Sequence, residues 1–156
     1  MDDKNLVLQK LLTKMLVKSV LNNFHNQLKR EKISHAELSR KAGKLENAFN
    51  KTFNECEDPS FSSFLRYWHA FNSITEISDE KLNTKGSFQF EELIKKEDQK
   101  MLNLISQLKD YDLNSMAIED KTFLKRLKYY FDILKLSKTL TDEEILIYEE
   151  ICSSNN

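Results

Sequence analysis

Glycine and proline are almost absent from this chain, which holds two glycines and one proline in 156 residues. A β-sheet protein of this length needs many more turn residues to reverse its strands. Apolar residues recur instead at three- and four-residue spacings, and strict apolar–polar alternation is scarce. These features predict an all-α fold of long helices joined by few turns, with no sheet.

The segment from Lys4 to Glu31 contains a row of apolar residues at four-residue intervals. The row is Leu8, Leu12, Leu16, Val20, Phe24 and Leu28. Each step turns the side chain by about 40° on an α-helix, so the row winds halfway around it. One straight helix could not bury this row against one neighbour. The segment is therefore either two helices with a break near Ser19, or one helix with two different neighbours. In the second case the C-terminal half packs on the following domain, and the N-terminal half needs a partner surface.

Short helices with recognisable ends follow this segment. A capping box at Ser34–Glu37 begins a helix that ends at Ala42, where Gly43 stops it because glycine readily takes a positive φ. The next two helices are expected at about 45–55 and 61–72. Their inward residues are predicted to be Phe49 and Phe53, and Phe64, Leu65, Trp68 and Phe71.

The second half of the chain predicts a small helical domain. The polar stretch 73–87 is a candidate linker, with room for a short helix near 77–82. Helical patterns then cover about 88–109, 115–137 and 142–152, and the last opens with a second capping box at Thr141–Glu144. The predicted domains are residues 1–77, which begin with an N-terminal helical extension, and residues 88–156, with 78–87 as linker.

Charge, cysteine content and the N-terminus limit the class of protein. Residues 1–72 carry 12 Lys/Arg against 8 Asp/Glu, whereas residues 73–156 carry 12 against 17, so the first half is the basic one. Cys56 and Cys152 lack metal-ligand companions and are expected to be free thiols in a reducing compartment. Lysines interrupt the apolar N-terminus, which excludes a signal peptide and a membrane span there. We therefore expect a cytoplasmic protein.

Catalytic and cofactor signatures are missing from the sequence. It contains no nucleophile–base arrangement, Gly-rich phosphate loop or HExxH, and its three histidines are too scattered for a metal triad. We predict a protein that is not an enzyme and needs neither cofactor nor metal. The strong preference for Lys over Arg, 20 to 4, hints at A+T-rich coding in a low-GC bacterium or its phage.

Residues 20–77 resemble the lambda-repressor-like, Cro/repressor helix-turn-helix family. The matching residues keep the family's spacing: Leu28, Ile33, Ser34, Glu37, Leu38, Ala42, Gly43, Phe49, Phe53, Pro59, Ser60, Phe64, Trp68 and Phe71. The resemblance implies a DNA-binding domain with Leu45–Glu55 as the recognition helix in the major groove. Lys44 stands where the family has an apolar residue, which leaves the start of that helix open.

The resemblance also implies which side chains contact DNA. Base contacts are expected from Lys44, Glu46, Asn47, Asn50, Lys51 and Asn54. Asn47 and Asn50 are the best candidates, because an asparagine amide can pair with adenine through two hydrogen bonds. Phosphate contacts are expected from Ser34, His35, Arg40 and Lys41. The acidic residues Glu55, Glu57 and Asp58 lie where members often contact phosphate, and they would be repelled by it.

Aromatic and aliphatic residues in the predicted 115–137 helix form a broad apolar surface. They are Phe123, Leu127, Tyr130, Phe131 and Leu134. A small helical unit buries such a face poorly by itself. The surface is therefore either the core of the domain or an interface with a second copy or another partner.

Three functions are compatible with these patterns. The first is a sequence-specific regulator of transcription that binds double-stranded DNA, in particular a dimeric repressor from a phage or another mobile element that reads an inverted repeat. The second is an inhibitor similar in plan to type II anti-CRISPR proteins, with a C-terminal domain that binds a Cas nuclease of the host and a helix-turn-helix that represses its own promoter. The third is a scaffold that contacts only protein.

Overall fold

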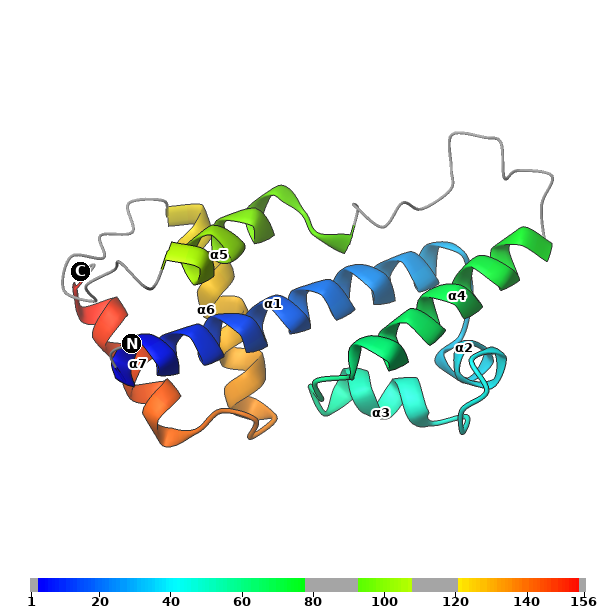
Figure 1. The fold of residues 1–156 in the computed structure, drawn as a ribbon, viewed down its shortest axis with the longest axis horizontal. Helices are drawn as coiled ribbons and strands as arrows, with labels where there is room; N and C mark the ends of the chain where they lie inside the picture. Colours follow the sequence, from blue (N-terminus) through cyan, green and yellow to red (C-terminus); the bar gives the residue numbers. More distant parts are fainter. Residues whose placement is uncertain (1–2, 78–92, 108–120, 155–156) are drawn as a thin grey trace. The chain divides into compact units, whose positions relative to one another are not determined.

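The computed structural model describes residues 3–77, 93–107 and 121–154 of the chain. Seven helices and no strand occur in these ranges (Figure 1), which confirms the predicted all-α fold. The helices are α1 (Asp3–Arg30), α2 (His35–Lys41), α3 (Ala48–Asn54), α4 (Phe61–Ile77), α5 (Lys96–Gln107), α6 (Lys121–Leu136) and α7 (Asp142–Ser154).

Two compact units make up the fold. Unit 1 combines Met1–Ser19 with Ile94–Asn156, and unit 2 is Val20–Leu93. α1 is one unbroken helix that contributes its first part to unit 1 and the rest to unit 2. The predicted first domain, residues 1–77, is therefore divided differently: its N-terminal extension packs with the C-terminal helices. The reason is the winding apolar row of α1, whose two halves face different neighbours.

The core of unit 1 is built from apolar side chains of α1, α5, α6 and α7. In Figure 1 the three later helices surround the N-terminal part of α1. Phe131 of α6 stacks on Tyr148 of α7, with ring centroids 3.8 Å apart. The other buried apolar residues of the unit are Leu8, Leu11, Leu12, Met15, Met101, Phe123, Leu127, Tyr130, Leu134, Ile147 and Ile151. The partner surface predicted for the first half of α1 is thus supplied by the chain itself.

The five residues proposed as a dimer or partner interface lie inside unit 1. Phe123, Leu127, Tyr130, Phe131 and Leu134 are all buried in the monomer. Because α6 packs this face on α1 and α7, the face is covered without a second protein. The interface prediction for these residues is therefore wrong, and the alternative, an intradomain core, is correct.

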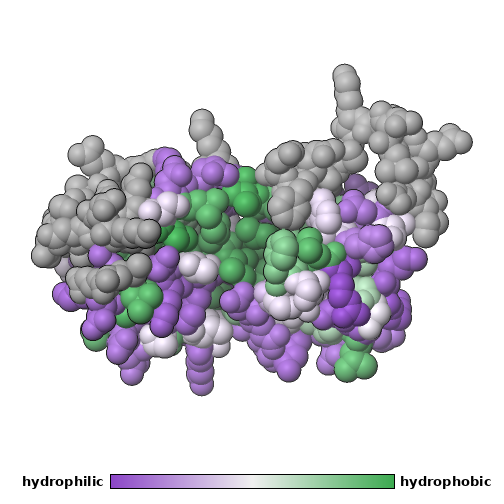
Figure 2. Space-filling view, in the orientation of Figure 1, coloured by the Kyte–Doolittle hydropathy of each residue, from purple (hydrophilic) through white to green (hydrophobic). Residues whose placement is uncertain are grey.

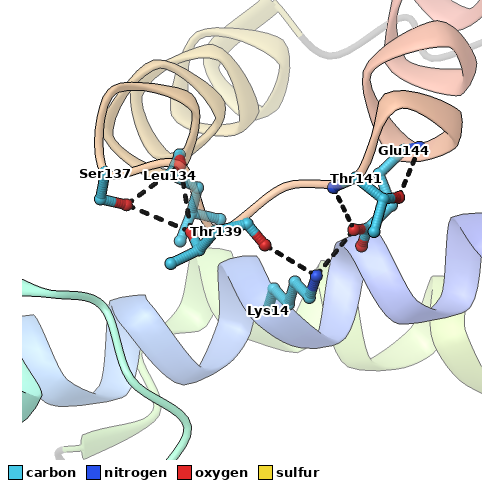
Figure 3. A network of polar contacts seen from close by, with 6 residues as sticks. All are labelled: Lys14, Leu134, Ser137, Thr139, Thr141 and Glu144. Atoms are coloured by element: carbon cyan, nitrogen blue, oxygen red, sulfur yellow. Dashed lines mark hydrogen bonds and ion pairs between the residues drawn. The ribbon is translucent and has the colours of Figure 1, made fainter.

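A partly buried ion pair joins α1 to the start of α7 (Figure 3). The Lys14 Nζ atom lies 2.7 Å from Glu144 Oε1 and donates a second hydrogen bond, 2.9 Å long, to the Thr139 carbonyl. Thr141 and Glu144 form the predicted capping box, since the Thr141 N–H donates to Glu144 Oε1 and the Glu144 N–H donates to Thr141 Oγ1. The Glu144 carboxylate therefore serves both as a helix cap and as the counter-ion of Lys14.

A second polar cluster connects three helices of unit 1. Asp98 of α5 is fully buried, and its Oδ1 accepts hydrogen bonds from the Ser19 hydroxyl of α1 at 2.7 Å and from Arg126 Nη2 of α6 at 2.9 Å. Its Oδ2 accepts from the Lys95 N–H at 2.9 Å. This last bond caps α5, so the helix begins at Lys96, and Leu93–Lys95 are not α-helical although the predicted helix includes them.

The core of unit 2 is organised around Phe24 of α1. Its ring centroid lies between 5.7 and 6.3 Å from the rings of Phe49, Phe64, Trp68 and Phe71. Leu21, Leu28, Ile33, Leu38, Ala42, Tyr67, Ala70 and Leu93 are also buried. The predicted core of this unit is largely confirmed, although Phe53 and Trp68 are only half-buried and Leu65 is exposed.

Four helices end in the same way, and only one of them uses glycine. Lys32, Gly43, Cys56 and Lys138 follow α1, α2, α3 and α6, and each has a φ between 53° and 74°. After α1, for example, the Ile33 N–H donates to the Leu28 carbonyl. This is the Schellman arrangement, which normally favours glycine. Lys32, Cys56 and Lys138 take the left-handed conformation with a Cβ, so the chain reverses direction with few glycines.

Part of the predicted C-terminal organisation can be compared with the structure. α4 extends to Ile77, so Ser73–Ile77 are helical and do not belong to a linker. The predicted linker 78–87 and the helical stretches 88–92 and 115–120 lie outside the described residues.

Candidate nucleic-acid interface

The segment from Ser34 to Asn54 contains two short helices joined by a tight turn. The Ser34 hydroxyl caps α2 by accepting a hydrogen bond from the Glu37 N–H at 3.0 Å, as the sequence predicts. Gly43 then takes a φ of +74° and closes the end of α2. A Cβ atom at Gly43 would lie only 3.3 Å from Arg66 Nη2, and that guanidinium donates to the Ala42 carbonyl at 3.0 Å. The turn is therefore held from α4.

α3 is attached to α2 through buried groups. The Ser39 hydroxyl of α2 accepts a hydrogen bond from the Phe49 N–H at 3.0 Å, and both side chains are fully buried. This bond satisfies one of the backbone N–H groups at the start of α3 that have no partner within the helix. Phe49 and Thr52 face the core, so the remaining side of α3 faces outward.

The helix predicted at Leu45–Glu55 begins later than expected. Residues 45–47 are not helical, and α3 starts at Ala48 instead of Leu45. Leu45 is 79% exposed and does not anchor a helical turn. The register of α3 is set instead by Phe49, whose side chain enters the core and whose N–H is bound by Ser39.

Most of the predicted base-contacting residues lie on the exposed side of this segment. Glu46, Asn47, Asn50, Lys51 and Asn54 are exposed, and Lys44 is half-buried. Figure 2 shows that the visible surface over α2 and α3 is mainly hydrophilic. Asn47 precedes α3, but its side chain makes no capping hydrogen bond. Its amide is therefore available for a hydrogen-bonding partner such as a base edge.

The other amide candidate, Asn50, is held by a chain of polar contacts. Asn50 Oδ1 lies 3.1 Å from His35 Nδ1 and accepts a hydrogen bond from Asn54 Nδ2 at 3.0 Å. His35 Nε2 lies 2.8 Å from His25 Nδ1. The chain thus runs from α1 through the first residue of α2 to the exposed side of α3.

The predicted phosphate contacts have different surroundings. Arg40 pairs with Glu46, with 2.8 Å between Nη1 and Oε1, and both side chains are exposed. Ser34 is used as the cap of α2, and the ring nitrogens of His35 face His25 and Asn50. Lys41 is exposed and makes no ion pair with a described residue, so it is the cation of this group most available to an anion.

A shallow groove of about 760 Å³ lies beside α3. Its walls include Lys44, Lys51, Glu57, Pro59 and Tyr67. Lys44 Nζ donates to the Ser63 hydroxyl at 2.9 Å, and Lys51 lies 3.9 Å from Glu57. Burial raises the pKa of the Tyr67 hydroxyl, although a hydrogen bond with Thr52 and the charge of Arg66 lower it. Tyr67 therefore stays neutral. The Lys44 ammonium on the wall contacts a hydroxyl and the Tyr67 ring but has no acidic partner among the described residues.

The charge split between the two halves of the sequence does not coincide with the two units. Grouped by unit, unit 1 carries 14 Lys/Arg and 14 Asp/Glu, and unit 2 carries 10 and 11. The difference arises because four lysines of the first 19 residues belong to unit 1, where Lys14 is neutralised by Glu144. Unit 2 is thus nearly neutral as a whole, and any attraction to phosphate must come from local cations on α2 and the following turn.

Sequence reasoning missed the histidine contact. The three histidines are scattered in the sequence, but the His25 ring stacks on Phe53 with centroids 4.2 Å apart and meets His35. The signal was present but weak: His25 follows Phe24, the centre of the core, and therefore lies at the edge of the buried side of α1.

Comparisons of the chain with protein-family models, with curated proteins and with solved structures find no match. Within the described ranges, no helix is both long enough and apolar enough to cross a membrane. The described residues also contain no group of three or more His, Cys, Asp or Glu side chains that could hold a metal ion.

Proposed function

We propose that the protein is a sequence-specific regulator that binds double-stranded DNA through the α2–turn–α3 segment. The observation that carries the proposal is the two-sided character of α3. Phe49 and Thr52 anchor one side in the core, while Asn47, Asn50 and Lys51 are exposed on the other. A short helix with exposed amides and a cation is suited to hydrogen-bonding with base edges in the major groove.

Rigid support of this helix favours recognition of a sequence over general attraction to DNA. α3 is bound to α2 through Ser39, and its Phe49 packs against Phe24 of α1 and Tyr67 of α4. Side chains held on a fixed helix lose little additional freedom when they bind a base. The proposed role of Asn47 follows from its unused amide, which offers a donor and an acceptor to adenine.

The electrostatic contribution to binding should be modest. Lys41 and Lys44 lie on or beside the turn, whereas Arg40 and Lys51 are near Glu46 and Glu57. With about two to four phosphate contacts, the logarithm of the binding constant should fall with the logarithm of salt concentration with a slope of about −2 to −4. A dimer on an inverted repeat belongs to the same proposal, because two copies of α3 would read two half-sites.

The test uses the full-length protein and duplexes that it selects from a random-sequence pool. Asn47→Ala should weaken binding to the selected duplex by about 1–3 kcal/mol and leave binding to random duplex nearly unchanged. Asn103→Ala is the matched control, since Asn103 is an exposed helical asparagine of unit 1. If the wild-type protein binds no duplex at low ionic strength, where electrostatic attraction is strongest, the proposal is wrong.

A further inference from the structure

We infer that His35 fixes the Asn50 amide so that this side chain offers only hydrogen-bond donors to DNA, and that Asn50 therefore reads guanine. The inference rests on the proposed contact between α3 and DNA. It concerns the base that Asn50 selects and the residues that set this choice. It differs from the adenine contact that the sequence predicted for Asn50.

The direction of the two hydrogen bonds that link His25, His35 and Asn50 follows from the Asn50 carbonyl oxygen, which can only accept. A carbonyl oxygen cannot donate, so the 3.1 Å contact between His35 Nδ1 and Asn50 Oδ1 requires the hydrogen on His35 Nδ1. In neutral His35 the Nε2 atom is then a bare acceptor, and His25 Nδ1 must donate across the 2.8 Å contact. If His35 is protonated, both its nitrogens donate. In either state His35 Nδ1 keeps its hydrogen and Asn50 Oδ1 accepts it.

The second lone pair of the same oxygen is also used. Asn54 Nδ2 donates to Asn50 Oδ1 from one helical turn further along α3, at 3.0 Å. Both acceptor sites of the Asn50 carbonyl are therefore occupied within the protein. The Asn50 Nδ2 group has no acceptor among the described residues, and the side chain is exposed. Asn50 thus presents two N–H donors and no free acceptor.

The base that matches such a group is guanine. In the major groove guanine presents two acceptors, N7 and O6, whereas adenine presents the N7 acceptor beside an N6 donor. A free asparagine amide pairs with adenine because it supplies an acceptor for N6. With its oxygen occupied, Asn50 would instead place a donor against the N6 donor of adenine, which is unfavourable.

The rings around His35 explain why this arrangement is fixed. His35 is only partly exposed and meets the Phe49 ring edge-on, with centroids 4.8 Å apart at 87°. His25 stacks on Phe53 and contacts the other nitrogen of His35. The His35 ring is thus held on both sides, and rotation of Asn50 would break two hydrogen bonds. His35 acts as a positioning residue, because it orients Asn50 without touching the base.

The first experiment determines the histidine tautomers in the full-length protein without DNA. The ¹⁵N–¹H correlation spectra should show His35 with its hydrogen on Nδ1. A hydrogen on Nε2 with a bare Nδ1 would overturn the inference, whether or not the protein binds DNA. The tautomer result therefore separates failure of this inference from failure of the proposed function.

The second experiment measures binding to a duplex selected from a random pool. Two replacements of the guanine read by Asn50 are tested, one by adenine and one by 7-deazaguanine. Each should weaken wild-type binding about fivefold to tenfold, which is the effect of one hydrogen bond. Asn50→Ala should remove this discrimination. His35→Phe, which keeps a ring but frees the Asn50 oxygen, should make adenine tolerated, and His35→Gln, which restores an N–H donor, should recover the preference for guanine.

Three results would contradict the inference. The wild-type protein could prefer adenine at the position sensitive to Asn50. Asn50→Ala could weaken selected and random duplexes equally, which would assign the side chain to the phosphate backbone. Binding of no duplex at all would remove both the inference and the proposed function. Circular dichroism of each variant verifies that unit 2 remains folded.

Discussion

Lys14 and Glu144 lie 130 positions apart in the sequence, and their charged atoms are 2.7 Å from each other. Glu144 is only 2% exposed, whereas the Lys14 side chain is 35% exposed. The carboxylate therefore carries most of the desolvation cost, and the lysine together with Thr141 compensates for it. The ion pair ties the first helix of the chain to the last one.

Removing the cation should leave a buried carboxylate without its counter-ion. Lys14→Met is expected to lower the free energy of unfolding by about 2–4 kcal/mol, somewhat less than for a fully buried pair because Lys14 is partly hydrated. The double variant Lys14→Met, Glu144→Leu should lose less than the sum of the two single changes. Urea denaturation measures these values. Lys10→Met is the control, because Lys10 is an exposed lysine of the same helix. Additive losses would show that the two groups do not interact.

The contribution of Glu144 to stability should depend on pH. Burial raises the pKa of this carboxyl, but the bonds from Lys14 and Thr141 outweigh burial and hold the pKa below its ordinary value. Because the folded pKa is below the unfolded value of about 4.3, the stabilisation is complete above about pH 5 and is lost as the pH falls through the folded pKa. The difference in unfolding free energy between wild type and Glu144→Gln should therefore shrink between pH 6 and pH 3. Glu149→Gln, at an exposed position of the same helix, should show a much smaller change.

Local signals in the sequence predicted much of this structure. The capping box at Thr141–Glu144 and the stop at Gly43 depend on neighbouring residues, and the structure contains both. Of the box predicted at Ser34–Glu37, the structure shows the bond from the Glu37 N–H to the Ser34 hydroxyl. The winding row of α1 left two possibilities open, two helices with a break near Ser19 or one helix with two different neighbours, and the structure has the second. A sequence pattern does not identify those neighbours, since pairs such as Lys14 and Glu144 are distant in the chain and follow no periodicity.

The helix ends that lack glycine could not be predicted from local sequence signals. Gly43 marks its own turn, but Lys32, Cys56 and Lys138 adopt the same backbone conformation with residues that normally avoid it. For the candidate site, the exposed residues of α3 were identified correctly. The contact between His25 and His35 was missed, because ten residues separate them and only the packing of α1 on α2 brings them together.

Glycine should be preferred at one of these left-handed positions. Lys138 has a φ of 61°, and the Thr139 N–H donates to the Leu134 carbonyl across it. Lys138→Gly removes the Cβ strain but adds freedom to the unfolded chain, so a net gain of about 0.5–1 kcal/mol in unfolding free energy is expected. Lys125→Gly makes the same chemical change inside α6, where glycine should destabilise by about 1 kcal/mol. Equal effects of the two substitutions in thermal denaturation would refute this explanation of the helix end.

The division of α1 between two units predicts that a fragment ending with α4 will self-associate through the newly exposed first half of α1. Such association would say nothing about the oligomeric state of the full-length protein. A fragment of residues 1–77 contains all of α1 but lacks α5, α6 and α7, so Leu8, Leu11, Leu12 and Met15 lose the side chains that bury them. Each exposed side chain of this kind costs about 1.5–3 kcal/mol of burial. The fragment should therefore bind a hydrophobic dye and sediment as an oligomer, while the full-length protein does not bind the dye.

Two further proteins distinguish this artefact from true dimerisation. In the same fragment, Leu11→Glu with Met15→Glu should restore a monomer, because both positions belong to the uncovered face and neither contributes to the core of unit 2. A fragment of residues 20–93 should be free of the association, because it omits that face while retaining Phe24 and Leu93. If residues 20–93 still form a dimer in sedimentation velocity, the interface lies in unit 2 itself. Dimerisation on an inverted repeat would then not require the C-terminal helices.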